Sequence, residues 1–136
     1  IGVPYTTLTG LGGGNPSVIV NGNFADGLTG WSTIVSGQTI EVVGGRFHLA
    51  TTGPDCSIYQ NGVVEDGKTY RIRADFDHIS GNNMRIVVGG TTTSFSGSDT
   101  GKLDYLEVAG SGGIFQIKRN SGAVEFYLDN ITVTEV

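Results

Sequence analysis

The sequence has a single cysteine, few charged residues and little positive charge. One cysteine, Cys56, excludes a disulfide within the chain and a cysteine-rich zinc site, and its neighbours indicate a buried strand position. Eight Lys and Arg residues stand against thirteen Asp and Glu residues, which gives a net charge of −5. Without a basic run, the counterion release that drives nucleic-acid binding is weak, so we expect no nucleic-acid partner.

Long apolar runs and helical patterns are also missing. No apolar run approaches the roughly 18 residues that a membrane-spanning helix needs, so we expect no membrane insertion. No long stretch spaces its apolar residues as one helix face requires, and 23 glycines interrupt the chain. Helices are therefore not expected, and 136 residues are enough for one β domain with a single core.

From residue 17 onward, short runs of β-forming residues alternate with turn signals, in the rhythm of a β-sandwich. The expected strands span residues 17–20, 30–35, 38–43, 46–50, 56–60, 68–78, 84–88, 91–95, 102–109, 114–119 and 123–135. Gly44-Gly45 separates two of them by two residues, which predicts a tight hairpin. We expect residues 17–136 to form the folded domain and the glycine-rich residues 1–16 to form a flexible arm or linker.

Two of the expected strands have patterns that define their faces. Between the apolar residues of 68–78 lie Arg71, Arg73, Asp75 and Asp77. One side of this strand is therefore expected in the core and the other in solvent. In the last strand the apolar residues change parity after Leu128, which predicts a β-bulge at Asp129-Asn130.

Three segments form a pattern that extends over about residues 17–136. They are Asn21-Gly22-Asn23-Phe24 followed by Gly30-Trp31, the strand entry Gly67-Lys68-Thr69-Tyr70, and the closing Phe126-Tyr127-Leu128-Asp129-Asn130. In this order they resemble carbohydrate-binding modules with the galactose-binding-like jelly roll. The resemblance implies an all-β fold, a jelly-roll β-sandwich of two antiparallel sheets.

In that family a structural calcium ion is commonly held where the first and last strands meet. The resemblance implies calcium ligands at Asn21, Asn23 and Asp129, together with an acidic residue after the Phe. The acidic position is Ala25 here, which removes a carboxylate from an ion that prefers about six to eight oxygen ligands. Asp129 has a second interpretation, in which its carboxylate accepts backbone N–H groups and stabilises the bulge.

A sugar site in this fold needs exposed aromatic rings and planar polar groups. Trp31 and the phenylalanines are expected in the core, whereas Tyr127 has outward parity. The strands at 68–78, 84–88, 114–119 and 123–129 are interpreted as one sheet. On its solvated face lie the candidate carbohydrate-binding residues Arg71, Arg73, Asp75, Gln116, Glu125 and Tyr127. The same side chains are equally explained as ordinary cross-strand ion pairs.

Two functions from different classes follow. The first is a non-catalytic carbohydrate-binding-like module, displayed on an extracellular or virion surface, whose partner is a glycan or polysaccharide. The second is a structural protein of a phage or other extracellular assembly, such as a decoration, tail or fibre protein, with a homo-oligomer or assembly partner joined through residues 1–16. No catalytic residues are expected, because no nucleophile elbow or phosphate loop occurs and Asp75 and Asp77 lie beside arginines.

Overall fold

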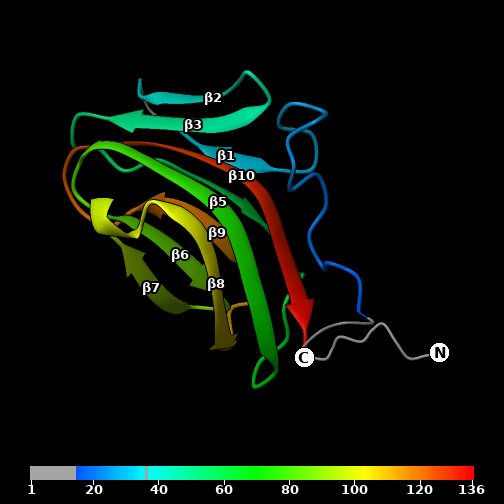
Figure 1. Ribbon diagram of the computed structural model, residues 1–136. Coiled ribbons are helices and arrows are strands. Elements are labelled where there is room, and N and C mark those ends of the chain that lie inside the picture. The colour runs from blue at the N-terminus through cyan, green and yellow to red at the C-terminus, as the bar shows by residue number, and fades with distance from the viewer. Residues whose placement is uncertain (1–14, 36) are drawn as a thin grey trace.

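The computed structural model describes residues 15–35 and 37–136 and shows two antiparallel sheets packed face to face (Figure 1). Sheet I has the strand order β2 (Thr39–Val43), β3 (Arg46–Thr51), β10 (Val124–Glu135), β5 (Thr69–Gly81) and β8 (Gly101–Val108). Sheet II has the order β1 (Ser32–Ile34), β4 (Ser57–Gln60), β9 (Phe115–Arg119), β6 (Met84–Val88) and β7 (Thr91–Phe95). A short 3₁₀ helix, η1 (Gly97–Asp99), lies between β7 and β8. The predicted all-β, two-sheet sandwich is confirmed.

Most strands begin and end close to their predicted positions, and β6 and β7 match residues 84–88 and 91–95. The hairpin between β2 and β3 is also confirmed. Its two glycines, Gly44 and Gly45, have φ of 59° and 77°, as the favoured two-residue turn requires. Residues 1–14 of the predicted arm lie outside the described residues. Within the described part of the chain, no helix is long and apolar enough to cross a membrane.

Residues 17–20, expected as a strand, form an isolated bridge between Ser17 and Thr134 instead. The backbone of Val20 bonds to the side-chain amide of Gln60, which donates to the Val20 carbonyl at 2.8 Å and accepts from its N–H at 3.1 Å. This side chain takes the place of a neighbouring strand, so regular pairing does not continue. The prediction of a strand at 17–20 is wrong for that reason.

A column of aromatic rings runs through the core between the two sheets. Consecutive ring centroids are 5.3 to 6.4 Å apart in the series Trp31, Phe24, Phe47, Phe126, Phe76, Phe95 and Tyr105. Trp31 is 7% exposed, and its indole N–H donates to the Asn21 carbonyl at 3.1 Å, so the predicted core position is confirmed. Cys56 is buried, also as predicted. Burying each large apolar side chain stabilises the fold by roughly 1.5–3 kcal/mol.

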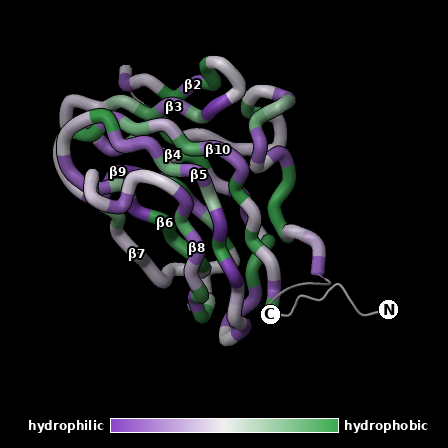
Figure 2. Tube along the Cα trace, in the orientation of Figure 1, coloured by the Kyte–Doolittle hydropathy of each residue, from purple (hydrophilic) through white to green (hydrophobic). Residues whose placement is uncertain are grey.

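The two long strands β5 and β10 lie side by side in the middle of sheet I, and hydrophobic and hydrophilic residues alternate along them (Figure 2). Their register shifts between Asp129 and Thr132, where Asn130 has a φ of 50°. The predicted β-bulge is therefore confirmed. Its consequence is that apolar residues enter the core both before and after the bulge, although their parity differs.

Candidate functional site

The outward side chains of sheet I form a surface of charged and aromatic groups, which we call the polar face. Because successive residues of a strand point to opposite sides, the charged residues of β5 point away from the core. The polar face consists of Glu41, Arg46, His48, Arg71, Arg73, Asp75, Asp77, Lys102, Asp104, Glu125 and Tyr127. It includes the predicted sugar-contacting residues Arg71, Arg73, Asp75, Glu125 and Tyr127, and the structure thus brings these together on one side of the molecule.

Tyr127 is the aromatic residue of the polar face, and its ring has two partners within the chain. His48, opposite it on β3, stacks on the ring with the centroids 4.4 Å apart and the planes inclined by 13°. The guanidinium of Arg46 lies over the ring, with Cζ 4.1 Å from the centroid, and donates to Asp77 Oδ2 at 3.1 Å. Tyr127 therefore has less free ring surface for a sugar than its outward parity alone implies.

His48 connects this cluster to two carboxylates. Its Nδ1 lies 2.8 Å from Glu41 Oε2, and its Nε2 lies 2.8 Å from Glu125 Oε2. Burial disfavours the charged ring, but the hydrogen bonds and charges of the two glutamates outweigh it, so the pKa of His48 is raised above 6.5. A protonated His48 donates from both nitrogens and joins β2, β3 and β10 across the polar face.

Asp75 lies in the middle of sheet I, beside the bulge of β10. Its carboxylate accepts from Asn130 Nδ2 at 2.7 Å and from Lys102 Nζ at 2.8 Å. The hydrogen bond from Asn130, followed by that from Lys102, lowers the pKa of Asp75 below its ordinary value. Asp75 is therefore a fixed, ionised acceptor at neutral pH.

At the edge of the polar face, β8 supplies one carboxylate for two arginines of β5. Arg71 donates from Nε and Nη2 to the two carboxylate oxygens of Asp104, at 2.8 and 2.6 Å. These hydrogen bonds raise the pKa of Arg71 and lower the pKa of Asp104. Arg73, whose side chain is 57% exposed, has its Nε 3.7 Å from the same carboxylate. Its guanidinium is thus accessible to a ligand from solvent.

Several depressions of different volume lie on the polar face or at its end. One of about 460 Å³ lies at the end of sheet I, and Glu125 is its charged residue. Another, of about 370 Å³, lies between β5, β8 and the bulge of β10 and is lined by Arg73, Ala74, Asp75, Lys102, Leu103, Asp104, Asn130 and Thr132. A depression of about 250 Å³ adjoins it, since Asp75 and Lys102 line both. The two adjoining depressions hold most of the charged groups.

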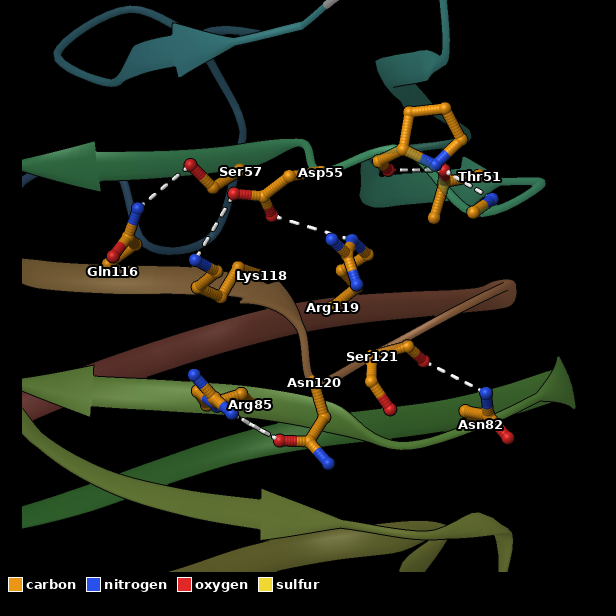
Figure 3. A network of polar contacts seen from close by, with 12 residues as sticks. Thr51, Asp55, Ser57, Asn82, Arg85, Gln116, Lys118, Arg119, Asn120 and Ser121 are labelled. Atoms are coloured by element: carbon orange, nitrogen blue, oxygen red, sulfur yellow. Dashed lines mark hydrogen bonds and ion pairs between the residues drawn. The ribbon is translucent and has the colours of Figure 1, made fainter.

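Gln116 does not belong to the polar face. The interpretation that residues 84–88 and 114–119 share a sheet with β5 and β10 is wrong, because β6 and β9 pair with each other in sheet II. Gln116 points outward on the opposite side of the sandwich, where its amide donates to Ser57 Oγ at 2.9 Å (Figure 3). A ligand that lies on the polar face cannot reach it.

The expected calcium ligands make hydrogen bonds within the chain. The Asn21 carbonyl accepts the indole N–H of Trp31 at 3.1 Å. The side-chain oxygens of Asn23 and Asp129 accept backbone N–H groups at 3.1 and 2.8 Å, and the second of these bonds is the one that the bulge interpretation predicts. Residues 15–35 and 37–136 contain no group of three or more His, Cys, Asp or Glu side chains placed to hold a metal ion. In this arrangement the residues do not fit calcium, and the calcium site rests on the family resemblance alone.

Sequence reasoning missed several members of the polar face. The pairing of Glu41 with His48 had a usable signal, because a two-residue hairpin at Gly44-Gly45 fixes that register. The sequence holds no comparable signal for Arg46, Lys102 and Asp104, because their roles depend on which strands lie beside β10 and β5. Those neighbours are decided by contacts between residues far apart in the sequence.

No protein-family model matches the sequence, and no curated protein matches it. Solved structures do match the fold, and most of those compared are carbohydrate-binding modules. The chain therefore has the jelly-roll β-sandwich fold of carbohydrate-binding modules, as the resemblance in its sequence implied. At the low identities involved, this likeness establishes the fold and not the ligand.

Three solved structures illustrate the likeness. The CBM1 module of BiXyn10A, in its apo form, has a TM-score of 0.64 and 15% identity, over 84% of this chain and 94% of that chain. TmCBM61, in complex with β-1,4-galactotriose, has a TM-score of 0.61 and 12% identity, and the match covers 88% of this chain and 99% of that chain. The enzymatically active domain of tailspike protein 4 of bacteriophage CBA120 has a TM-score of 0.62 and 10% identity. There the match covers 88% of this chain and 21% of the tailspike chain, so this chain spans about a fifth of it.

Proposed function

We propose that this chain is a non-catalytic carbohydrate-binding module that binds a glycan across the polar face. The observation that carries the proposal is the pair of adjoining depressions that share Asp75 and Lys102. Guanidinium, carboxylate, ammonium and amide groups converge there. The planar guanidinium, carboxylate and amide groups form paired hydrogen bonds with neighbouring sugar hydroxyls, and they fix the orientation of a ligand in a shallow site.

The ion pairs of the polar face hold these groups in place before a ligand arrives. Asp75 is fixed by Lys102 and Asn130, and Arg71 by the two oxygens of Asp104. Groups that are already ordered lose little conformational entropy on binding. An ionised carboxylate has about four acceptor sites, so Asp75 retains capacity for sugar hydroxyls beyond its two hydrogen bonds.

The same contacts argue against glycoside hydrolysis. That reaction needs a carboxylic acid whose pKa is raised, so that it can protonate the leaving group. On the polar face the pKa of Asp75 is lowered instead, and Asp77 is ion-paired with Arg46 at 3.1 Å. Asp75 is therefore not suited to donate a proton, and the ion pair with Arg46 suits Asp77 to recognition.

The test is a glycan array followed by titration calorimetry with the best ligand, including β-1,4-galactotriose because the similar TmCBM61 was solved with it. Changing Arg73, Asp75 or Tyr127 to Ala is expected to weaken binding about tenfold or more, since each change removes a charged hydrogen bond or a ring contact. Lys68→Ala, which removes a charge outside the polar face, is the control. Affinity that survives all three changes, or an array without any ligand, excludes the proposal.

A structural role without a glycan is the second candidate, and exposed apolar side chains favour it. On the edge strand β8, Leu106 and Val108 are 49% and 53% exposed, a feature that suits contact with another protein. The likeness in fold to the phage tailspike domain also supports this candidate. Under either candidate we propose an extracellular or virion-surface location, with residues 1–16 as the segment that joins a neighbour.

A further inference from the structure

The two sheets of the sandwich carry opposite charge. The strands of sheet I contain eight Asp and Glu residues and four Lys and Arg residues. The strands of sheet II, all of which lie within the described residues, contain three Lys and Arg residues and no Asp or Glu. A chain whose net charge is −5 therefore has one basic side.

The three basic residues of sheet II, which we call the basic patch, are Arg85 on β6 and Lys118 and Arg119 at the end of β9 (Figure 3). Arg85 and Lys118 are direct cross-strand partners, so their Cβ atoms are about 5 Å apart on the outer face. The side chain of Lys118 is 21% exposed. Arg119, 22% exposed, is the register partner of the buried Met84 and therefore lies on the core side of β9, at the end of the strand. Like charges at this spacing, partly removed from water, favour an anion placed between them.

Carboxylates of the chain neutralise the basic patch only in part. Asp55, just before β4, lies 3.3 Å from Lys118 Nζ and 3.6 Å from Arg119 Nε, and this Nε is buried without a hydrogen-bond partner. Arg85 donates from Nε and Nη2 to the amide oxygen of Asn120, a neutral group, at 3.0 and 2.6 Å. Lys118 and Arg119 thus share one carboxylate, whereas Arg85 donates to a neutral group.

Neutral hydrogen-bonding groups lie next to the basic patch on the same side of sheet II. Gln116 donates to Ser57 at 2.9 Å, and Tyr59 is the register partner of Gln116. Ser94 on β7 donates to Asn120 at 3.2 Å. The Ser57 hydroxyl is buried, so the groups beside the cations that suit a partner with both hydroxyl and anionic groups are the Gln116 amide, the Tyr59 phenol and the Ser94 hydroxyl.

We propose that the outer face of sheet II is a second binding site, which takes an anionic polysaccharide whose carboxylate or sulfate groups lie on Arg85 and Lys118 of the basic patch. Beyond the two N–H groups that Asn120 accepts, Arg85 has N–H groups on Nη1 and Nη2 that match two oxygens of such a group, and Lys118 adds a point charge beside it. The site lies on the opposite side of the sandwich from the polar face. It does not depend on glycan binding there.

A nucleic acid and a second copy of this chain are the competing partners. Affinity for nucleic acid rises with the number of phosphates neutralised, and three cations on a chain of net charge −5 neutralise few. The acidic sheet I of a second copy is a weaker match, because Asp75, Asp77 and Asp104 already have cationic partners. An anionic polysaccharide is therefore the partner that fits the basic patch best.

The test measures binding of the full chain to polygalacturonate and to chondroitin sulfate by affinity electrophoresis and calorimetry. Neutral β-1,4-galactan and an oligothymidylate are the comparison ligands. We expect at least one of the two anionic polysaccharides to bind, with an affinity that falls as the salt concentration rises because ions screen the contact.

Arg85→Gln and Lys118→Gln are each expected to weaken this binding about tenfold. Lys68→Gln removes the same charge outside the patch, where Lys68 pairs with Glu135 at 3.3 Å, and is expected to leave binding unchanged.

Asp55→Asn is expected to change the affinity in the opposite direction. Removing this carboxylate releases Lys118 for an external anion, so binding of the anionic polysaccharide should strengthen severalfold. A thermal melt of each variant checks that it is folded. If Asp55→Asn does not fold, Arg85→Gln and Lys118→Gln still decide the matter.

Several results overturn the proposal. It fails if neither anionic polysaccharide binds at low salt, or if Lys68→Gln weakens binding as much as the patch variants do. Tighter binding of the oligothymidylate identifies nucleic acid as the partner. Self-association that Arg85→Gln abolishes identifies the patch as an interface between copies. Binding of neutral galactan reports on the polar face and succeeds or fails separately, so the two proposals can be distinguished.

Discussion

His48 lies between Glu41 and Glu125 while its ring stacks on Tyr127, so its protonation affects three neighbours at once. The pKa of His48 in the folded chain is raised above 6.5, which means that folding favours the protonated ring. The resulting stabilisation is fully present below the pKa that this residue has in the unfolded chain. It is lost as the pH rises through the higher pKa of the folded chain.

We predict that His48→Gln lowers the melting temperature more at about pH 6 than at about pH 8, because only the protonated ring joins both glutamates. Thermal unfolding followed by circular dichroism at the two pH values measures the difference. Glu41→Gln and Glu125→Gln each remove one partner and are expected to make the stability of the chain depend less on pH in this range. If His48→Gln lowers the melting temperature equally at both pH values, the prediction is contradicted.

Single residues of the core could be predicted well from the sequence. Phe126 is buried as expected, because the side of a strand on which a residue lies depends on its immediate neighbours. Trp31 and Cys56, each just before a strand, are also buried as expected. The stacking of His48 on Tyr127 could not be predicted, since it requires β3 to lie beside β10. This is why the expected free aromatic ring of the polar face is partly covered.

Among the elements, β10 shows how an irregularity can connect strands. At its bulge Asn130 has a φ of 50° and donates its amide to Asp75 at 2.7 Å. We predict that Asn130→Ala destabilises the fold by about 1–2 kcal/mol, because Ala tolerates this φ poorly and cannot replace the hydrogen bond. Asn130→Gly loses only the hydrogen bond and is expected to cost less. Urea unfolding measures the free energy of unfolding of both variants. A larger loss of this free energy for Asn130→Gly than for Asn130→Ala would show that backbone strain is not the main cost.

The junction between the N-terminal segment and β10 is closed by direct backbone contacts. The Ile131 N–H donates to the Gly22 carbonyl at 2.9 Å, and a side chain at Gly22 would collide with the Ile131 carbonyl. We predict that adding calcium after chelation leaves the melting temperature unchanged, because these contacts already join the two segments. Scanning fluorimetry measures it. A rise of several degrees would instead establish the calcium site that the family resemblance implies.

The first and last residues of the strands could be predicted better than the arrangement of the strands in the two sheets. Local β propensity and turn residues decide where a strand such as 84–88 begins and ends, and these are visible in the sequence. Sheet membership depends on contacts between distant residues, and β6 and β9 belong to the sheet opposite β5 and β10. Gln116 was consequently assigned to the wrong side of the sandwich.

For the whole molecule, the choice between a carbohydrate-binding module and an assembly protein depends on its oligomeric state. The edges of the two sheets are β2 and β8 in sheet I and β1 and β7 in sheet II, and such edges can pair with another chain. Charged Lys102 and Asp104 on β8 oppose that pairing. We therefore predict a monomer by size exclusion with light scattering. A closed oligomer or polymer without a glycan ligand would favour the structural role.

The segment that leads into the sandwich and the strand that completes it meet at one place. Ser17 bridges to Thr134, and its hydroxyl accepts the N–H of Val133 at 3.0 Å. A host protein could therefore receive residues 17–134 as an insertion in a surface loop, because both splice points would emerge next to each other and the loop would stay closed. The domain is therefore suited to insertion into an unrelated scaffold protein without a long linker between the two splice points.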